Sequence, residues 1–135
     1  MENLKKYLDD DGCRGAVRSA GGTVRIFRRR GVIDLFTLLT DEPEFVKGGI
    51  IADKVIGRGA AFLLVEGKIA EVYAHLISTP ALDVLNKAGI PVTYSQKAAN
   101  IINREGTDIC PVEKLTASAS SPSEAYTLIK NFLKQ

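Results

Sequence analysis

Polar residues that could act on a ligand gather at two places in the chain. At the first, Asp53 and Lys54 follow the apolar residues 50–52 and precede a run of small residues typical of a helix. A carboxylate and an ammonium at such a junction can hold a hydroxyl, a phosphate or another anion, because backbone N–H groups at the start of a helix lack partners. Aspartate is also a frequent helix cap, so capping alone is an equal alternative for Asp53.

The second place is the sequence Cys110-Pro111-Val112-Glu113. A cysteine just before a helix gains thiolate character, so we consider Cys110 a candidate nucleophile and Glu113 a candidate base. The alternatives are a small buried cysteine in a turn and a glutamate that caps a helix. The only histidine, His75, lies in a β-prone run, where a hydrogen-bonded core role is more typical than a partnership with Cys110.

Five further residues are candidates for ligand binding. The glycine among them would let a ligand or a backbone approach closely, and the two arginines would clamp an anion unless they are only surface charges. We expect the group to converge on Asp53, because the carboxyl ends of parallel strands meet at one edge of a sheet. No spacing typical of a metal site occurs among them, and we predict neither a metal nor a cofactor. The five are Gly57, Arg58, Ser78, Asn103 and Arg104.

The first third of the chain supplies a hairpin between two helices. Residues 3–10 are typical of a short helix, and residues 15–19 and 23–27 flank a glycine-rich turn that favours a β-hairpin. Residues 32–39 place apolar side chains at helical spacing.

The middle of the chain alternates strands and helices. The pattern predicts a strand at 50–52, a helix at 57–65, a strand at 68–77, a capped helix that runs from Ser78 to a stop at Gly89, and a strand at 90–94. Repeated strand-helix-strand units imply right-handed crossovers and parallel strands. The last third predicts helices at 96–103 and 109–115 and a terminal helix capped by Ser121. The whole is a single domain, residues 1–135, with a three-layer α/β/α architecture and a mixed sheet.

This order of elements resembles the cytidine deaminase-like fold. More closely, the chain resembles a family of uncharacterised prokaryotic proteins, a domain of unknown function assigned to that fold. The resemblance covers most of the chain and rests on DKVIGRGAA at residues 53–61, on Ser78, on Asn103-Arg104 and on CPVE at residues 110–113. By resemblance to other members of the fold, a homo-oligomer is also expected.

The chain departs from the catalytic members of that fold. Zinc deaminases open one helix with a His or Cys two residues before a Glu, and another with Pro-Cys-x-x-Cys. Aligned here, these positions hold Asp53 and Val55, then Pro80, Ala81 and Val84. Alanine and valine neither bind zinc nor transfer a proton, so the alignment argues against deamination by a zinc hydroxide.

Composition narrows the class of protein. A net charge of +2 with 45% hydrophobic residues is typical of a globular domain. No run approaches the ~18 apolar residues of a membrane span, and the two cysteines do not form a disulfide framework, so we predict a cytoplasmic protein without membrane contact. Nucleic acid is an unlikely partner, because the arginine cluster is short and lacks the series of interleaved aromatic residues that would serve as base-stacking platforms. The cluster consists of Arg25, Arg28, Arg29 and Arg30.

Three classes of function remain. The first is a site that binds or acts on a small anionic or nucleotide-like molecule at the strand ends. The second is an enzyme with covalent chemistry at Cys110. The third is a non-catalytic interaction or oligomerisation module that keeps the scaffold alone.

Overall fold

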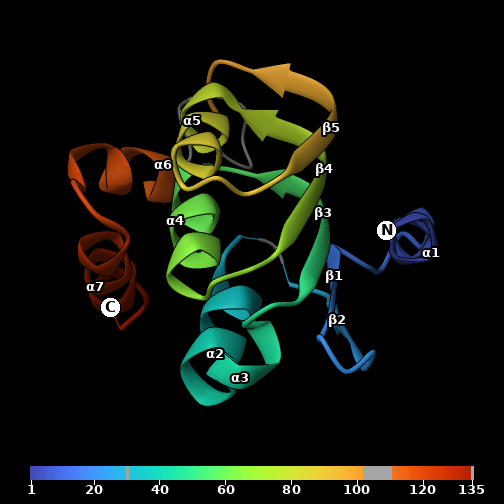
Figure 1. Cartoon of the computed structure of the whole chain (residues 1–135). Coiled ribbons are helices and arrows are strands. Elements are labelled where there is room, and N and C mark those ends of the chain that lie inside the picture. The colour runs from blue at the N-terminus through green and yellow to red at the C-terminus, as the bar shows by residue number, and fades with distance from the viewer. Residues whose placement is uncertain (30, 102–110, 135) are drawn as a thin grey trace.

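The computed structural model describes residues 1–29, 31–101 and 111–134. Its centre is a five-stranded mixed sheet with the order β2-β1-β3-β4-β5 (Figure 1). β1 is antiparallel to both β2 and β3, whereas β3, β4 and β5 are mutually parallel. The α/β class and the mixed sheet are therefore confirmed. The strands are β1 (Gly15–Arg18), β2 (Val24–Phe27), β3 (Ile50–Ile56), β4 (Glu71–Ser78) and β5 (Val92–Ala98).

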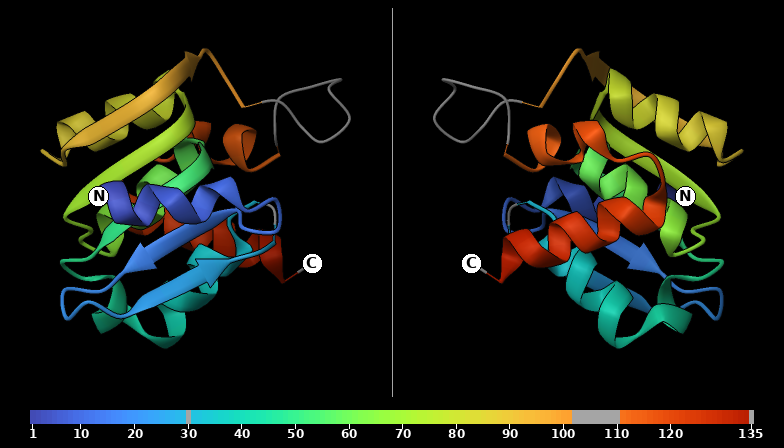
Figure 2. Two further views of the ribbon diagram at one scale, coloured as in Figure 1. Left: turned by 90° about the vertical axis from the view of Figure 1, so that its right-hand side faces the viewer. Right: turned by 90° about the vertical axis from the view of Figure 1, so that its left-hand side faces the viewer.

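Most helices cover one face of the sheet, and a short N-terminal segment covers part of the other (Figures 1 and 2). The N-terminal segment is α1 (Glu2–Lys5) with the 3-10 turn η1 (Lys6–Asp9). No helix in the described ranges is long and apolar enough to cross a membrane. The helices of the larger layer are α2 (Ile33–Asp41), α3 (Pro43–Val46), α4 (Arg58–Glu66), α5 (Thr79–Lys87), α6 (Pro111–Leu115), the 3-10 turn η2 (Thr116–Ser118) and α7 (Pro122–Leu133).

The main core lies between the sheet and α4. Val17, Ile51 and Val72 form a row across three strands, and all three are fully buried. Such continuous apolar rows are expected where helices cover a sheet. Gly59 in α4 lets α6 dock closely, because a Cβ at this position would collide with Val112. The small residues that open α4 thus serve helix packing at this point.

Several local predictions are confirmed. The hairpin, the helix that follows it, and the short helix before the terminal one all occur within a few residues of the predicted bounds. Ser78 caps α5 by accepting a hydrogen bond from the Ala81 N–H at 3.2 Å, and Ser121 caps α7 by accepting from the Glu124 N–H at 3.1 Å.

Two local predictions are wrong. The strand predicted at 50–52 continues to Ile56, so Asp53 and Lys54 lie inside β3 and not at a junction with α4. The helix predicted at 96–103 begins instead as the end of β5, which runs to Ala98, and residues 99–101 are not helical. β5 is an edge strand, and its exposed polar residues hide the alternation that marks a strand.

Candidate functional site

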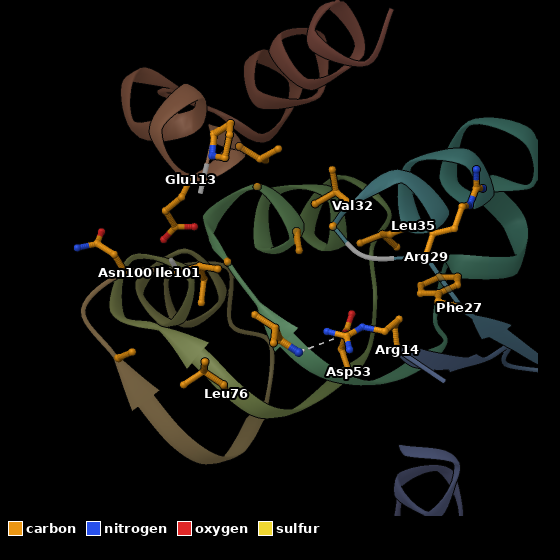
Figure 3. Close-up of a pocket in the computed structure, with 18 residues that line it drawn as sticks. Arg14, Phe27, Arg29, Val32, Leu35, Asp53, Leu76, Asn100, Ile101 and Glu113 are labelled. Carbon is orange, nitrogen blue, oxygen red and sulfur yellow. Dashed lines mark hydrogen bonds between the residues drawn. The ribbon is translucent and has the colours of Figure 1, made fainter. Parts of the chain in front are cut away.

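A cavity of about 530 Å³ lies on the α4 side of the sheet (Figure 3). Its floor comes from β3 and β4, and its walls come from α2, α4, α6 and the ends of β2 and β5. A volume of this size suits a small-molecule ligand. The lining residues are Arg14, Phe27, Arg29, Gly31, Val32, Leu35, Asp53, Val55, Gly57, Gly59, Ala60, Leu76, Ala98, Asn100, Ile101, Pro111, Val112 and Glu113.

Asp53 is the acid on the cavity floor. It pairs with Gly15 of β1, where a Cβ would lie only 3.1 Å from the Asp53 Cγ, so the glycine leaves room for the carboxyl group. The Val55 N–H donates to Asp53 Oδ1 at 3.3 Å. Burial raises the pKa of Asp53 to about 7, although the N–H groups of Val55 and Lys54 and the charge of Arg14 act to lower it. Near neutral pH this carboxyl group can therefore both donate and accept a proton.

Arg14 lies beside Asp53 and is half-buried (Figure 3). Its backbone is fixed on both sides, because its N–H donates to Phe27 O at 2.7 Å and its carbonyl accepts from the Lys54 N–H at 3.0 Å. Within the ranges that the structure describes, its guanidinium forms no hydrogen bond or ion pair. Arg29 differs, since Asp34 holds it by an ion pair. Of these two arginines, Arg14 is therefore the one whose guanidinium can bind an anionic ligand in the cavity.

Glu113 approaches the cavity from α6 and is only 3% exposed. Its Oε2 accepts the Arg58 N–H at 2.7 Å, so it caps α4, whose own N-cap residue, Gly57, has no side chain. A Cβ on Gly57 would press against this oxygen. The other oxygen, Oε1, is buried and has no hydrogen-bond partner among the described residues. A buried acceptor of this kind has an unmet requirement for a donor.

The remaining walls are largely apolar. Leu76 and Val55 come from neighbouring parallel strands, and Ile101 and Val112 close the side near α6. Asn100 adds an amide near Glu113 (Figure 3). The cavity therefore combines an apolar body with charged groups at separate points, which is the usual character of a small-molecule site.

The structure brings three of the sequence-predicted site residues together: Asp53, Gly57 and Glu113 line the cavity. Arg58 contributes its backbone N–H to Glu113, but its side chain is not part of the lining. Cys110, Asn103 and Arg104 lie outside the described residues.

Lys54 and Ser78 lie elsewhere. Lys54 faces the opposite side of the sheet, where its Nζ donates to Asp10 O at 3.2 Å. Ser78 is fully buried, and the α5 cap accounts for its hydroxyl. The expected convergence of these two residues with Asp53 is therefore not observed. Lys54 points away because adjacent strand residues face opposite sides of the sheet, whereas Ser78 is buried at the start of α5.

His75 does not line the cavity either. Its Nδ1 is hydrogen-bonded to the Tyr73 hydroxyl at 2.7 Å, and the same hydroxyl contacts Ser95 Oγ at 2.7 Å. A hydrogen-bonded role for this histidine agrees with the prediction.

The alignment of Asp53 and Val55 with the opening of a deaminase helix is wrong. Both residues belong to β3, and α4 starts at Arg58. The residues at the true helix start, Gly57 and Gly59, have no ligating side chain. Across the described residues, no group of three or more His, Cys, Asp and Glu side chains could hold a metal ion.

Sequence reasoning missed Arg14 and Asn100. Arg14 is the residue just before β1, and Asn100 follows the edge strand whose end the sequence pattern predicts as a helix. The predicted hairpin was the only indication of Arg14 in the sequence. When the first strand of such a hairpin pairs with a central strand, the residue just before the hairpin lies beside that central strand.

Together these features define an α/β protein with an amphipathic pocket at the parallel strand ends. The chain belongs to the family described as TM1506, a domain of unknown function (DUF1893), whose model matches residues 3–133. It is similar to the crystal structure of a DUF1893 family protein (TM1506) from Thermotoga maritima, with 25% sequence identity and a TM-score of 0.84. That match covers 97% of this chain and 87% of the Thermotoga chain. No curated protein is similar enough to match.

Proposed function

We propose that the cavity binds, and acts on, a small anionic or nucleotide-like molecule. The observation that carries this proposal is Arg14, a half-buried residue that lines the cavity and whose guanidinium has no ion-pair partner in the described part of the chain. Burial of a charge without a partner is costly, so an anionic ligand would relieve it. The apolar walls would hold the body of the ligand.

Asp53 would supply the chemistry in this proposal. Its pKa of about 7 suits general acid or base catalysis at neutral pH, and it lies next to the proposed anion site. Arg14 would fix the ligand and Asp53 would move a proton. The scaffold would be a three-layer domain of the cytidine deaminase-like kind, with these two residues in place of the zinc-dependent machinery.

Thermal unfolding in the presence of inorganic phosphate, nucleoside monophosphates and sugar phosphates tests the proposal. A ligand at 100 times its dissociation constant stabilises a protein by about 2.7 kcal/mol, which is several degrees for a domain of this size. We expect at least one anion to stabilise the wild type. Arg14→Ala should abolish the shift, whereas Arg18→Ala, which removes an arginine outside the cavity lining, should retain it. No shift with any anion, or equal shifts in both variants, would contradict the proposal.

A further inference from the structure

We infer that the ligand of this cavity is a zwitterion, with its anionic group at Arg14 and an ammonium or guanidinium group at Glu113. This inference rests on the proposed function and narrows the class of ligand. Two groups of opposite charge carry it, Arg14 just before β1 and Glu113 in α6, and neither forms an ion pair within the described residues.

The requirement at Glu113 is specific. Glu113 lines the same cavity, and one of its carboxylate oxygens is occupied by the N–H of Arg58. The other oxygen, Oε1, is buried and lacks a donor among residues 1–29, 31–101 and 111–134. No cationic side chain forms an ion pair with Glu113 in this described part. The α4 dipole compensates part of the negative charge. A positively charged N–H donor on the ligand would satisfy both the hydrogen bond and the remaining charge.

Arg14 requires the opposite kind of group, an anion. Asp53 is its nearest acidic neighbour in the cavity, and burial disfavours the charged form of that carboxyl group, so it neutralises Arg14 only in part. Figure 3 places Arg14 and Asp53 at one side of the cavity, and Glu113 with Asn100 at another. The lining also includes the apolar side chains of Leu76 and Ile101. A ligand with charges at its two ends and an apolar middle matches this arrangement.

A series of ω-amino acids of increasing length tests the inference, because the series samples a range of distances between the two charges. The probes are glycine, 4-aminobutyrate and 6-aminohexanoate, each beside the acid without an amine: acetate, butyrate and hexanoate. Affinities for the full chain would be measured by calorimetry. Because the amine adds a charge-assisted hydrogen bond that the matched acid cannot form, we expect at least one amino acid to bind about tenfold or more tightly than its matched acid.

Two variants assign the two ends. Glu113→Gln keeps an oxygen for the Arg58 N–H and removes the charge, so it should abolish the preference for the amino acid over the acid. Arg14→Ala should weaken binding of the amino acid and of the acid alike. Circular dichroism of the unliganded variants would show that both are folded, and the wild-type comparison stands without either variant.

The outcomes separate this inference from the proposed function. If anions bind in an Arg14-dependent way but an added amine never improves affinity, the zwitterion is wrong and the anion site stands. If the amine improves affinity equally in the wild type and in Glu113→Gln, the assignment to Glu113 is wrong. If no probe binds and no other anion stabilises the protein, both ideas fail.

Discussion

The substitution Asp53→Asn isolates the ionisation of the acid on the cavity floor. Asparagine has nearly the same shape and keeps an oxygen that can accept the Val55 N–H. It cannot ionise. Any difference between the pH dependence of the wild type and that of the variant therefore reports the proton on Asp53.

The sign follows from the raised pKa. The folded protein holds this proton up to about pH 7, whereas the unfolded chain releases it near the ordinary aspartate value of 3.8. Between these values the folded state binds more protons, so the free energy of unfolding falls as the pH rises. The stabilising contribution is complete below the lower pKa and is lost above the higher one.

The magnitude is large enough to measure. One pH unit within that window corresponds to about 1.4 kcal/mol, and a range from about pH 5 to pH 8 samples about two such units. We therefore expect the stability of the wild type, relative to Asp53→Asn, to fall by about 2 to 3 kcal/mol across this range. Urea unfolding at several pH values gives the difference directly.

Asp34→Asn is the matched control. Burial alone would raise the pKa of Asp34, but the N–H groups of Arg29 and Arg28 and the Arg29 guanidinium outweigh it and hold the pKa below its ordinary value. The stability that Asp34 contributes is thus present above the unfolded pKa and is lost only as the pH falls through the folded pKa. Its difference from the wild type should stay constant from about pH 5 to pH 8. A constant difference for Asp53→Asn as well would refute the reasoning about the buried acid.

Three further substitutions test the packing around the site, each by chemical denaturation. Glu113→Ala should cost about 1 to 3 kcal/mol because it uncaps α4, and Glu113→Gln should cost less because the cap oxygen remains; equal losses would show that the cap is unimportant. Gly59→Ala should cost about 1 to 3 kcal/mol, since the added Cβ collides with Val112, and an unchanged midpoint would mean that α6 does not dock there. Ser78→Ala should cost about 1 kcal/mol without changing anion binding, and a loss of binding would return this serine to the site.

The architecture was largely predictable because its signals are local. The turn between β1 and β2, the caps at Ser78 and Ser121, and the apolar spacing of α2 depend on residues close in the sequence. Each of these signals predicted the correct element.

The ends of β3 and β5 were not predictable in the same way. β3 continues through Asp53 and Lys54 because their side chains go to different faces, one into the cavity and one toward Asp10. In the sequence alone, the adjacent charges of Asp53 and Lys54 are typical of the end of a strand, although β3 continues to Ile56. β5 carries exposed polar residues to Ala98 because nothing pairs with its outer edge in the described sheet.

The site was only partly predictable because long-range contacts assemble it. Arg14 reaches Asp53 through the antiparallel pairing of β1 with β3. The sequence allows Glu113 to act as a base or to cap a helix. It does cap a helix, but that helix is α4, which begins 55 residues earlier in the chain. Single-sequence patterns contain neither pairing.

The most direct test of the central claim is an amide NMR spectrum of the full chain, titrated with the anion that stabilises it most. We predict that the largest shifts fall on the amides of Arg14, Gly57 and Asn100, which surround the cavity, and that Arg14→Ala removes them. Shifts that centre instead on Tyr73 and His75, or that persist in Arg14→Ala, would contradict the assignment of this cavity as the ligand site.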